Sequence, residues 1–403
     1  MTHAFLSTLH AGRALGALLV SMTLAVGCGG GDSGVGAGGT GAPLSFSRGP
    51  ISGFGSIIVN GVHFDDSTAS VVDDDGNALS NLQSLRLGSV VDVQGGVVAA
   101  GATTASTIHV HVDLVGPVTA AYSAATGRLS VLGQSVRVLT STALDGFAGG
   151  APAIPAGSVV AVSSLYDKAT GVYVATRIDP APAATQFAIR GAPTAIDTSA
   201  DTFSIGATVF SYGSLAPPTT FATGELLRAV LGTTVDSQGR WVVTAFGQAL
   251  PTLPDGRAGA VQGVVSSTTD STHFVVNGVS VDASKATITP SGATIAVQSR
   301  VLVQGKIVSG VLVATSVQLN ASNDDDDHDG AGGGGFELEG AIVTLDTAGQ
   351  TLTMRGPTTV YYATATFSGG TAADLAVGKE IEVHGGLSPD GSQVIATQIE
   401  FDH

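Results

Sequence analysis

One pattern of four segments recurs five times along the chain, and this repetition constrains the fold more than any other feature. Each copy opens on a glycine inside an extended stretch, and successive opening glycines lie 67, 75, 72 and 77 residues apart. These glycines are Gly49, Gly116, Gly191, Gly263 and Gly340. A tandem repeat of this length predicts several structural units of one architecture in place of a single large domain.

Each copy carries the signals of short strands joined by tight turns. Apolar runs flank Asn60-Gly61 in the first copy and Asn277-Gly278 in the fourth. Asn-Gly between such runs favours a two-residue hairpin, because both turn residues need a positive φ. A Gly-x-x-apolar-x-apolar segment and a closing strand follow, so we expect about five strands per copy. The segment begins at Gly88, Gly157, Gly224 and Gly378, and Gln298 replaces the glycine in the fourth copy.

The length of the repeat selects the architecture. Propeller blades span about 40 to 50 residues and immunoglobulin-like sandwiches about 100, whereas a five-stranded barrel of the OB type fits about 72. The chain has 56 glycines among 403 residues and only 12% charged residues, which is typical of short strands and turns. We predict an all-β protein, a tandem array of about five small five-stranded OB-like barrels after a signal peptide and a flexible tether.

The repeats resemble a bacterial family of domains of unknown function, the DUF5666 type, which occurs in tandem in secreted proteins and lipoproteins. The resemblance extends from Gly49 to Phe401. It implies a small β-barrel for each copy and implies no activity, because one fold hosts many functions.

The repeats and the composition together predict the division of the chain. Copies 1 and 2 almost abut, so we expect them to pack together, whereas Pro-rich or Gly-rich stretches separate the later copies. The predicted segments are a lipoprotein signal peptide (1–27), a Gly-rich tether (28–45), four barrel modules (46–113, 114–179, 187–246 and 259–319), an acidic Gly-rich linker (320–335) and a fifth module (336–403).

The N-terminus predicts export and a lipid anchor. Residues 14–26 form an apolar run that suits a secretory signal and is too short to span a bilayer comfortably. The run ends in Leu24-Ala25-Val26-Gly27-Cys28, which resembles the bacterial lipobox, with alanine where that motif usually has leucine. The resemblance implies that Cys28 carries a diacylglyceryl group and an N-linked acyl chain such as palmitate. Several acyl chains on one residue anchor a protein stably.

The alternative is an ordinary cleaved signal in which the cysteine is incidental. Cys28 is the single cysteine of the chain, so disulfides within the chain and thiolate metal clusters are excluded. Gly29 follows it where an aspartate would, by analogy with enteric bacteria, favour retention in the inner membrane. We therefore expect an outer-membrane lipoprotein of the cell envelope.

Two clusters are weak candidates for metal binding. His109, His111 and Asp113 alternate along a predicted strand, which would place them on one face within reach of one ion. They resemble the start of the metallo-β-lactamase ligand motif, but Leu114 stands where that motif needs histidine. The alternative is the solvated face of an amphipathic strand.

The second cluster lies in the acidic linker. Asp325, Asp327 and Asp329 occupy the first, third and fifth positions of a calcium loop, and a glycine follows at the sixth. The twelfth position is Phe336 in place of glutamate, so weak divalent-cation binding and a solvated linker are both open. The shorter run Asp73-Asp74-Asp75-Gly76 is interpreted as a turn.

Charge and motifs narrow the function. The formal net charge is −16, which repels phosphate backbones, so we expect no nucleic-acid partner. We also expect no cofactor. No nucleophile elbow is present in the sequence. We expect a non-enzymatic cell-envelope lipoprotein that acts as a spacer or binding array for an envelope protein or polysaccharide. A calcium-responsive envelope protein is the alternative, and a metal-dependent hydrolase is the least favoured reading.

Overall fold

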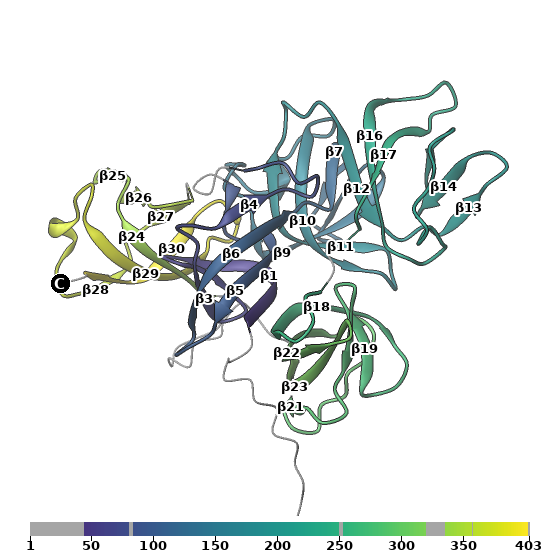
Figure 1. The fold of residues 1–403 in the computed structure, drawn as a ribbon. Helices are drawn as coiled ribbons and strands as arrows, with labels where there is room; N and C mark the ends of the chain where they lie inside the picture. Colours follow the sequence, from purple (N-terminus) through teal and green to yellow (C-terminus); the bar gives the residue numbers. More distant parts are fainter. Residues whose placement is uncertain (1–43, 80–83, 250–252, 320–334, 357, 402–403) are drawn as a thin grey trace, which may run out of the picture. The chain divides into compact units, whose positions relative to one another are not determined.

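The computed structural model describes residues 44–79, 84–249, 253–319, 335–356 and 358–401. Strands make up most of the regular structure in these ranges, which also contain two single 3-10 turns, η1 (Ala151–Ala153) and η2 (Ala372–Asp374). No helix within the same ranges is both long and apolar enough to cross a bilayer. Figure 1 shows the strands curled into small barrels, which confirms the predicted all-β class.

The strands follow the repeats. Copy 1 contains β1 (Leu44–Phe54), β2 (Ile57–Val59), β3 (Val62–Asp65), β4 (Ser70–Val72), β5 (Val90–Val97) and β6 (Ala102–His111). Copy 2 contains β7 (Leu114–Ser123), β8 (Arg128–Val131), β9 (Gln134–Ala143), β10 (Val159–Asp167) and β11 (Val172–Pro180). Copy 3 contains β12 (Phe187–Gly191), β13 (Ala195–Asp197), β14 (Thr202–Ile205), β15 (Thr208–Ser211), β16 (Leu227–Val235) and β17 (Trp241–Gly247).

The last two copies are built in the same way, with the first strand divided in two in copy 5. Copy 4 contains β18 (Ala258–Thr268), β19 (His273–Val276), β20 (Val279–Asp282), β21 (Thr287–Thr289), β22 (Arg300–Val308) and β23 (Val311–Leu319). Copy 5 contains β24 (Gly335–Ala341), β25 (Thr344–Asp346), β26 (Thr351–Thr353), β27 (Thr359–Tyr361), β28 (Thr366–Ser368), β29 (Glu380–Leu387) and β30 (Val394–Phe401).

The strand pairing closes each copy into a barrel. In copy 4, β18 pairs antiparallel with β19 and with β22, β19 pairs with β20, β20 lies parallel to β23, and β23 pairs with β22. This ring has no free edge, which protects Val-rich strands from pairing with other chains. Copies 1 and 2 repeat the ring, and copies 3 and 5 repeat it with the first strand divided in two.

The predicted hairpin turns are confirmed. Asn60 and Gly61 have φ angles of 56° and 71°, and Asn277 and Gly278 have 47° and 74°. Positive φ at both central residues defines the turn that matches the twist of the flanking strands. These turns connect β2 to β3 and β19 to β20.

The barrels contact one another through their first strands. β1 runs parallel to β18, with Arg48 opposite Val261, and further along it runs parallel to β24, with Gly53 opposite Glu337. The first strands of copies 2 and 3, β7 and β12, also pair with each other, but in the antiparallel direction. A side chain at Gly53 would meet the Glu337 carbonyl oxygen at 2.5 Å, so glycine permits this approach.

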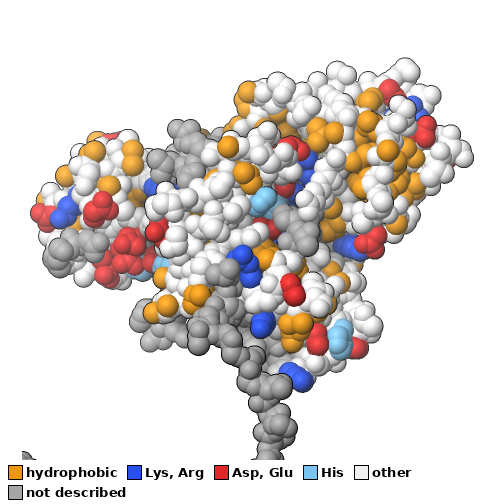
Figure 2. Space-filling view, in the orientation of Figure 1, with side chains coloured by type: hydrophobic (Ala, Val, Ile, Leu, Met, Phe, Trp, Pro, Cys, Tyr) orange, Lys and Arg blue, Asp and Glu red, His pale blue; other side chains and the backbone are white. Residues whose placement is uncertain are grey.

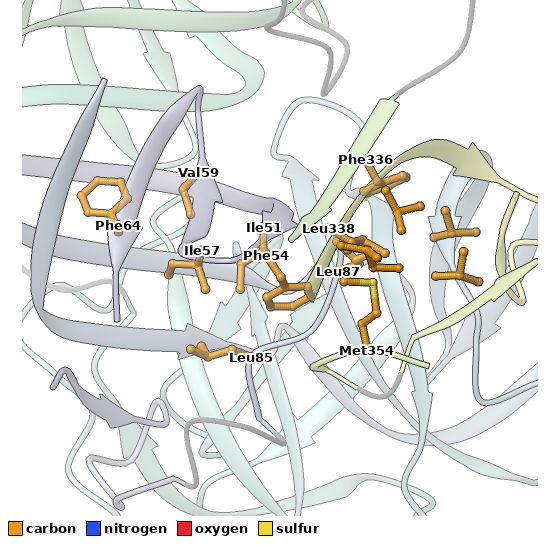
Figure 3. Close-up of a cluster of buried hydrophobic side chains, with 14 of the residues drawn as sticks. Ile51, Phe54, Ile57, Val59, Phe64, Leu85, Leu87, Phe336, Leu338 and Met354 are labelled. Atoms are coloured by element: carbon orange, nitrogen blue, oxygen red, sulfur yellow. The ribbon is translucent and has the colours of Figure 1, made fainter. Parts of the chain in front are cut away.

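Ion pairs and apolar side chains extend these contacts. Arg86 of copy 1 pairs with Asp145 and Asp179 of copy 2, as the adjacency of these copies predicts. Copies 1 and 5 share one continuous hydrophobic core, in which Phe54 and Leu87 lie beside Leu338 (Figure 3). The barrels of residues 44–401 are therefore packed against one another.

Candidate functional site

A buried ion pair joins the first and fifth strands of copy 1. Arg48 on β1 lies directly opposite Asp92 on β5, and each side chain is 1% exposed. The guanidinium donates two parallel hydrogen bonds, from Nε to Oδ1 at 2.5 Å and from Nη2 to Oδ2 at 2.6 Å. Although burial alone would raise the pKa of Asp92, Arg48 and His111 hold it well below the ordinary value. Both charges are therefore present and matched inside the protein.

His111, at the end of β6, lies between two carboxylates. Its Nδ1 is 2.7 Å from Asp74 Oδ1 and its Nε2 is 3.3 Å from Asp92 Oδ2. Burial alone would lower the pKa of His111, but Asp92 and Asp74 outweigh burial and raise the pKa above its ordinary value. His111 therefore favours its charged form in this position.

The network continues into copies 2 and 3 through Arg190 on β12. Its Nη1 donates to Asp113 Oδ1 at 2.9 Å, its Nη2 donates to Asp74, and its Nε donates to the Ala249 carbonyl oxygen at 2.5 Å. Asp113 Oδ2 accepts a hydrogen bond from Ser164 at 2.5 Å. Burial would raise the pKa of Asp74, but Arg190 and His111 hold it well below its ordinary value.

The run Asp73-Asp74-Asp75-Gly76 forms a turn, as predicted, but its carboxylates have an additional role. Asp73 Oδ1 accepts hydrogen bonds from the backbone of Asp75 and Asn77. Asp74 and Asp75 reach out of the turn, and Asp75 forms two hydrogen bonds with Arg228 of copy 3 at 2.6 and 2.9 Å. The turn thus connects two copies that lie far apart in the sequence.

The structure does not bring His109, His111 and Asp113 together as ligands of one metal. β6 ends at His111, so Asp113 lies in the connection to β7 and its carboxylate pairs with Arg190. The alternative interpretation, a solvated strand face, does not hold for His111 either, because this side chain is only 3% exposed. The outer face of one small barrel becomes interior where another barrel packs on it, and a single-barrel pattern does not reveal this.

A cavity of about 720 Å³ lies among copies 2, 3 and 4 beside this network. Asp113 and Arg190 form part of its wall. Tyr166 also lines it, is 8% exposed, and accepts a hydrogen bond from the Ala192 amide at 3.3 Å. The remaining wall mixes apolar side chains such as Leu226 and Val275 with polar ones, which include Lys168, Glu225, Asn277 and Ser280. Sequence reasoning missed this cavity because its wall comes from three copies.

A second group of titratable side chains lies on the outer face of copy 5. Among the described residues, one group of three histidine and carboxylate side chains could hold a metal ion. It consists of Glu337, Glu382 and His384, whose possible ligand atoms all lie within 4.8 Å of one another. Figure 2 shows acidic side chains gathered on the barrel that holds the C-terminal strands. The alternation along β29 places Glu382 and His384 on the outer face, opposite buried Ile381 and Val383.

Four predicted site residues lie outside the described residues. They are the lipidation candidate Cys28 and the linker carboxylates Asp325, Asp327 and Asp329. Their assignments stay predictions from the sequence.

Comparison with known proteins agrees with the repeats. A family model described as a domain of unknown function (DUF5666) matches residues 48–109, 115–179, 262–318 and 339–400. These matches fall on copies 1, 2, 4 and 5, while copy 3 has the same strand pairing without a match. No curated protein matches the chain. Because the four matches cover more than half of the sequence, the chain belongs to the DUF5666 family.

Proposed function

We propose that this chain is a non-enzymatic, lipid-anchored protein of the bacterial cell envelope, placed at the outer membrane, whose packed barrels bind a polysaccharide segment. The observation that carries the proposal is the cavity of about 720 Å³. This volume falls within the range of about 300 to 1,000 Å³ that is usual for small-ligand sites. A pure spacer has no need of such a hollow.

The chemistry of the wall supports a neutral, hydroxyl-rich ligand. Two cationic side chains, Lys168 and Arg190, are balanced by Asp113 and Glu225, so the wall does not select strongly for either sign of charge. Amide and hydroxyl groups of the wall both donate and accept hydrogen bonds, which suits the hydroxyls of a sugar. Tyr166 adds a further hydroxyl-bearing side chain to the wall.

The arrangement of the charges supports binding over catalysis. Asp113 is held by Arg190 and by Ser164, so both of its oxygens are engaged. The residues that line the cavity include neither histidine nor cysteine, which are frequent bases and nucleophiles. We therefore propose that the cavity binds its ligand without transforming it.

The anchor is proposed from the sequence of the signal peptide, with Cys28 as the acylated residue. Fatty-acid labelling in the producing cell should give a labelled protein for wild type and an unlabelled one for Cys28→Ala. A labelled Cys28→Ala protein would contradict the anchor.

An array of soluble bacterial envelope oligosaccharides tests the binding function of the mature full chain. Ser280 is exposed at the cavity wall, so Ser280→Trp would fill the hollow with little disturbance of the core. We expect the variant to weaken binding by at least about tenfold, which corresponds to about 1.4 kcal/mol.

Ser271→Trp is the matched control, because Ser271 is also exposed and lies on the same barrel outside the cavity wall. It should bind like wild type. Equal losses in both variants, or no binding by wild type, would contradict the ligand site. Cleavage of a bound oligosaccharide would contradict the non-enzymatic assignment.

A further inference from the structure

The repeats offer an internal comparison at one position of the barrel. The residue before the opening glycine is Arg48 in copy 1, Arg190 in copy 3 and Glu339 in copy 5. Arg48 faces Asp92 across the strand pair, whereas Glu339 faces Glu382. Copies 1 and 3 therefore place a cation at this position, while copy 5 places a carboxylate opposite a carboxylate.

The acidic character of copy 5 extends across three strands. Glu339, Glu382 and Glu400 are aligned in one row on β24, β29 and β30. Like charges directly opposite on neighbouring strands destabilise a sheet. Among the described residues, the ion pair recorded for this row is the one between Glu382 and His384, at 3.0 Å, and no lysine or arginine pairs with these three glutamates. A positive charge from outside the chain would remove the repulsion.

The neighbouring row supplies a mixed set of ligands. Glu337 lies directly opposite His384, and both are next to Glu382 on the outer face of the sheet. Because the ligand atoms of the three side chains fall within 4.8 Å of one another, they can converge on one ion. Rigid strands hold all three, so the site needs no loop to close over it.

We propose that Glu337, Glu382 and His384 form a binding site for a transition-metal dication of the zinc class. An imidazole nitrogen with carboxylate oxygens suits zinc better than calcium, which prefers oxygen ligands throughout. Three protein ligands leave a position for water or for a group of a partner molecule. This site is independent of the polysaccharide cavity and of the calcium-loop pattern in the linker.

The position of the site gives the metal a structural consequence. β24 carries Glu337 and also pairs with β1 at Gly53, so it belongs to the contact between copies 5 and 1. A metal that bridges β24 and β29 would hold this strand in its barrel. Metal binding should therefore stabilise copy 5 at its contact with copy 1.

A second histidine provides a matched control for the proposal. His273 is about as exposed as His384 and also lies near two carboxylates, Asp270 at 2.9 Å and Asp282 at 3.5 Å. However, Asp270 lies at Nδ1 and Asp282 at Nε2, on different sides of the ring. One ion cannot bind a single ring nitrogen and reach both carboxylates, so His273 should not take part in zinc binding.

The test is calorimetric titration of the mature full chain with zinc chloride, with thermal unfolding recorded for every variant. We expect one site in wild type, loss of its heat in His384→Ala and in Glu382→Gln, and unchanged binding in His273→Ala. Zinc should also raise the unfolding temperature of wild type and of His273→Ala. An Asp325→Asn, Asp327→Asn, Asp329→Asn variant separates the site from the linker.

The remaining outcomes overturn the proposal. Absence of zinc binding by the folded wild type would do so, and so would zinc binding that survives in both His384→Ala and Glu382→Gln. Loss of binding in the linker variant with retention in His384→Ala would assign the metal to the linker. Because Glu382→Gln preserves the shape of the side chain, it distinguishes a lost ligand from a lost fold if His384→Ala does not fold.

Discussion

At the scale of single residues, His111 makes the stability of the protein depend on pH. Its pKa in the folded state is raised, because Asp92 and Asp74 outweigh the effect of burial. A raised folded pKa gives stability that is fully present below the unfolded pKa of about 6.5 and is lost as the pH rises through the folded value. The opposite holds for Asp74 and Asp92, whose lowered pKa values give stability that is lost in acid.

We therefore expect the thermal unfolding midpoint of wild type to fall as the pH rises above about 6.5. His111→Gln should flatten this decline, because it removes the group that loses its proton. His109→Gln is the control on the same strand, since the ion pairs of the network among the described residues involve His111 and not His109. A wild-type decline that persists unchanged in His111→Gln would show that another group controls it.

At the scale of structural elements, one turn has the same backbone requirement in every copy. It is the turn that precedes β5, β10, β16, β22 and β29. Gly88, Gly157, Gly224 and Gly378 have φ angles between 77° and 85°, and Gln298 has 74° at the equivalent position of copy 4. Glycine adopts this conformation without steric cost, whereas other L-residues pay about 1 to 2 kcal/mol. The departure from the repeat pattern at Gln298 is therefore a site of backbone strain.

Gln298→Gly should stabilise copy 4 by about 0.5 to 1 kcal/mol, because relief of strain exceeds the entropy that glycine gains in the unfolded chain. Gly378→Ala is the reciprocal control: a Cβ there meets no atom within 4 Å, so its expected destabilisation is due to the backbone alone. Denaturant unfolding measures both changes. An unchanged free energy of unfolding in Gln298→Gly would indicate that Gln298 adopts this turn without strain.

The turns and the barrel could be predicted from the sequence, because they depend on local rules. Asn60-Gly61 requires positive φ wherever it joins two strands, and the alternation in β29 places Ile381 inward in any barrel. The buried network could not be predicted in the same way. Asp74 and Arg190 are 116 residues apart and meet only because the barrels pack together. A pattern within one copy carries no information on the face that another copy covers.

At the scale of the whole molecule, the shared core couples the first and last copies. Phe336 and Leu338 of β24 belong to the same buried cluster as Ile51 and Phe54 of β1 (Figure 3). Residues that pack in one core lose their contacts together, so the cooperative unit should cross the boundary between these repeats. The core of copy 4 is separate and takes Phe46 from copy 1.

Leu338→Ala should therefore expose amides of both copy 5 and copy 1 to hydrogen exchange. Leu338 is fully buried, and a buried Leu→Ala change costs about 2 to 5 kcal/mol. Leu312→Ala is the matched control, because Leu312 is equally buried in the core of copy 4. Exchange measured by mass spectrometry should show its effect mainly in copy 4. If Leu338→Ala accelerated exchange in copy 5 alone, the repeats would unfold as independent barrels, and the common core would contribute nothing to cooperativity.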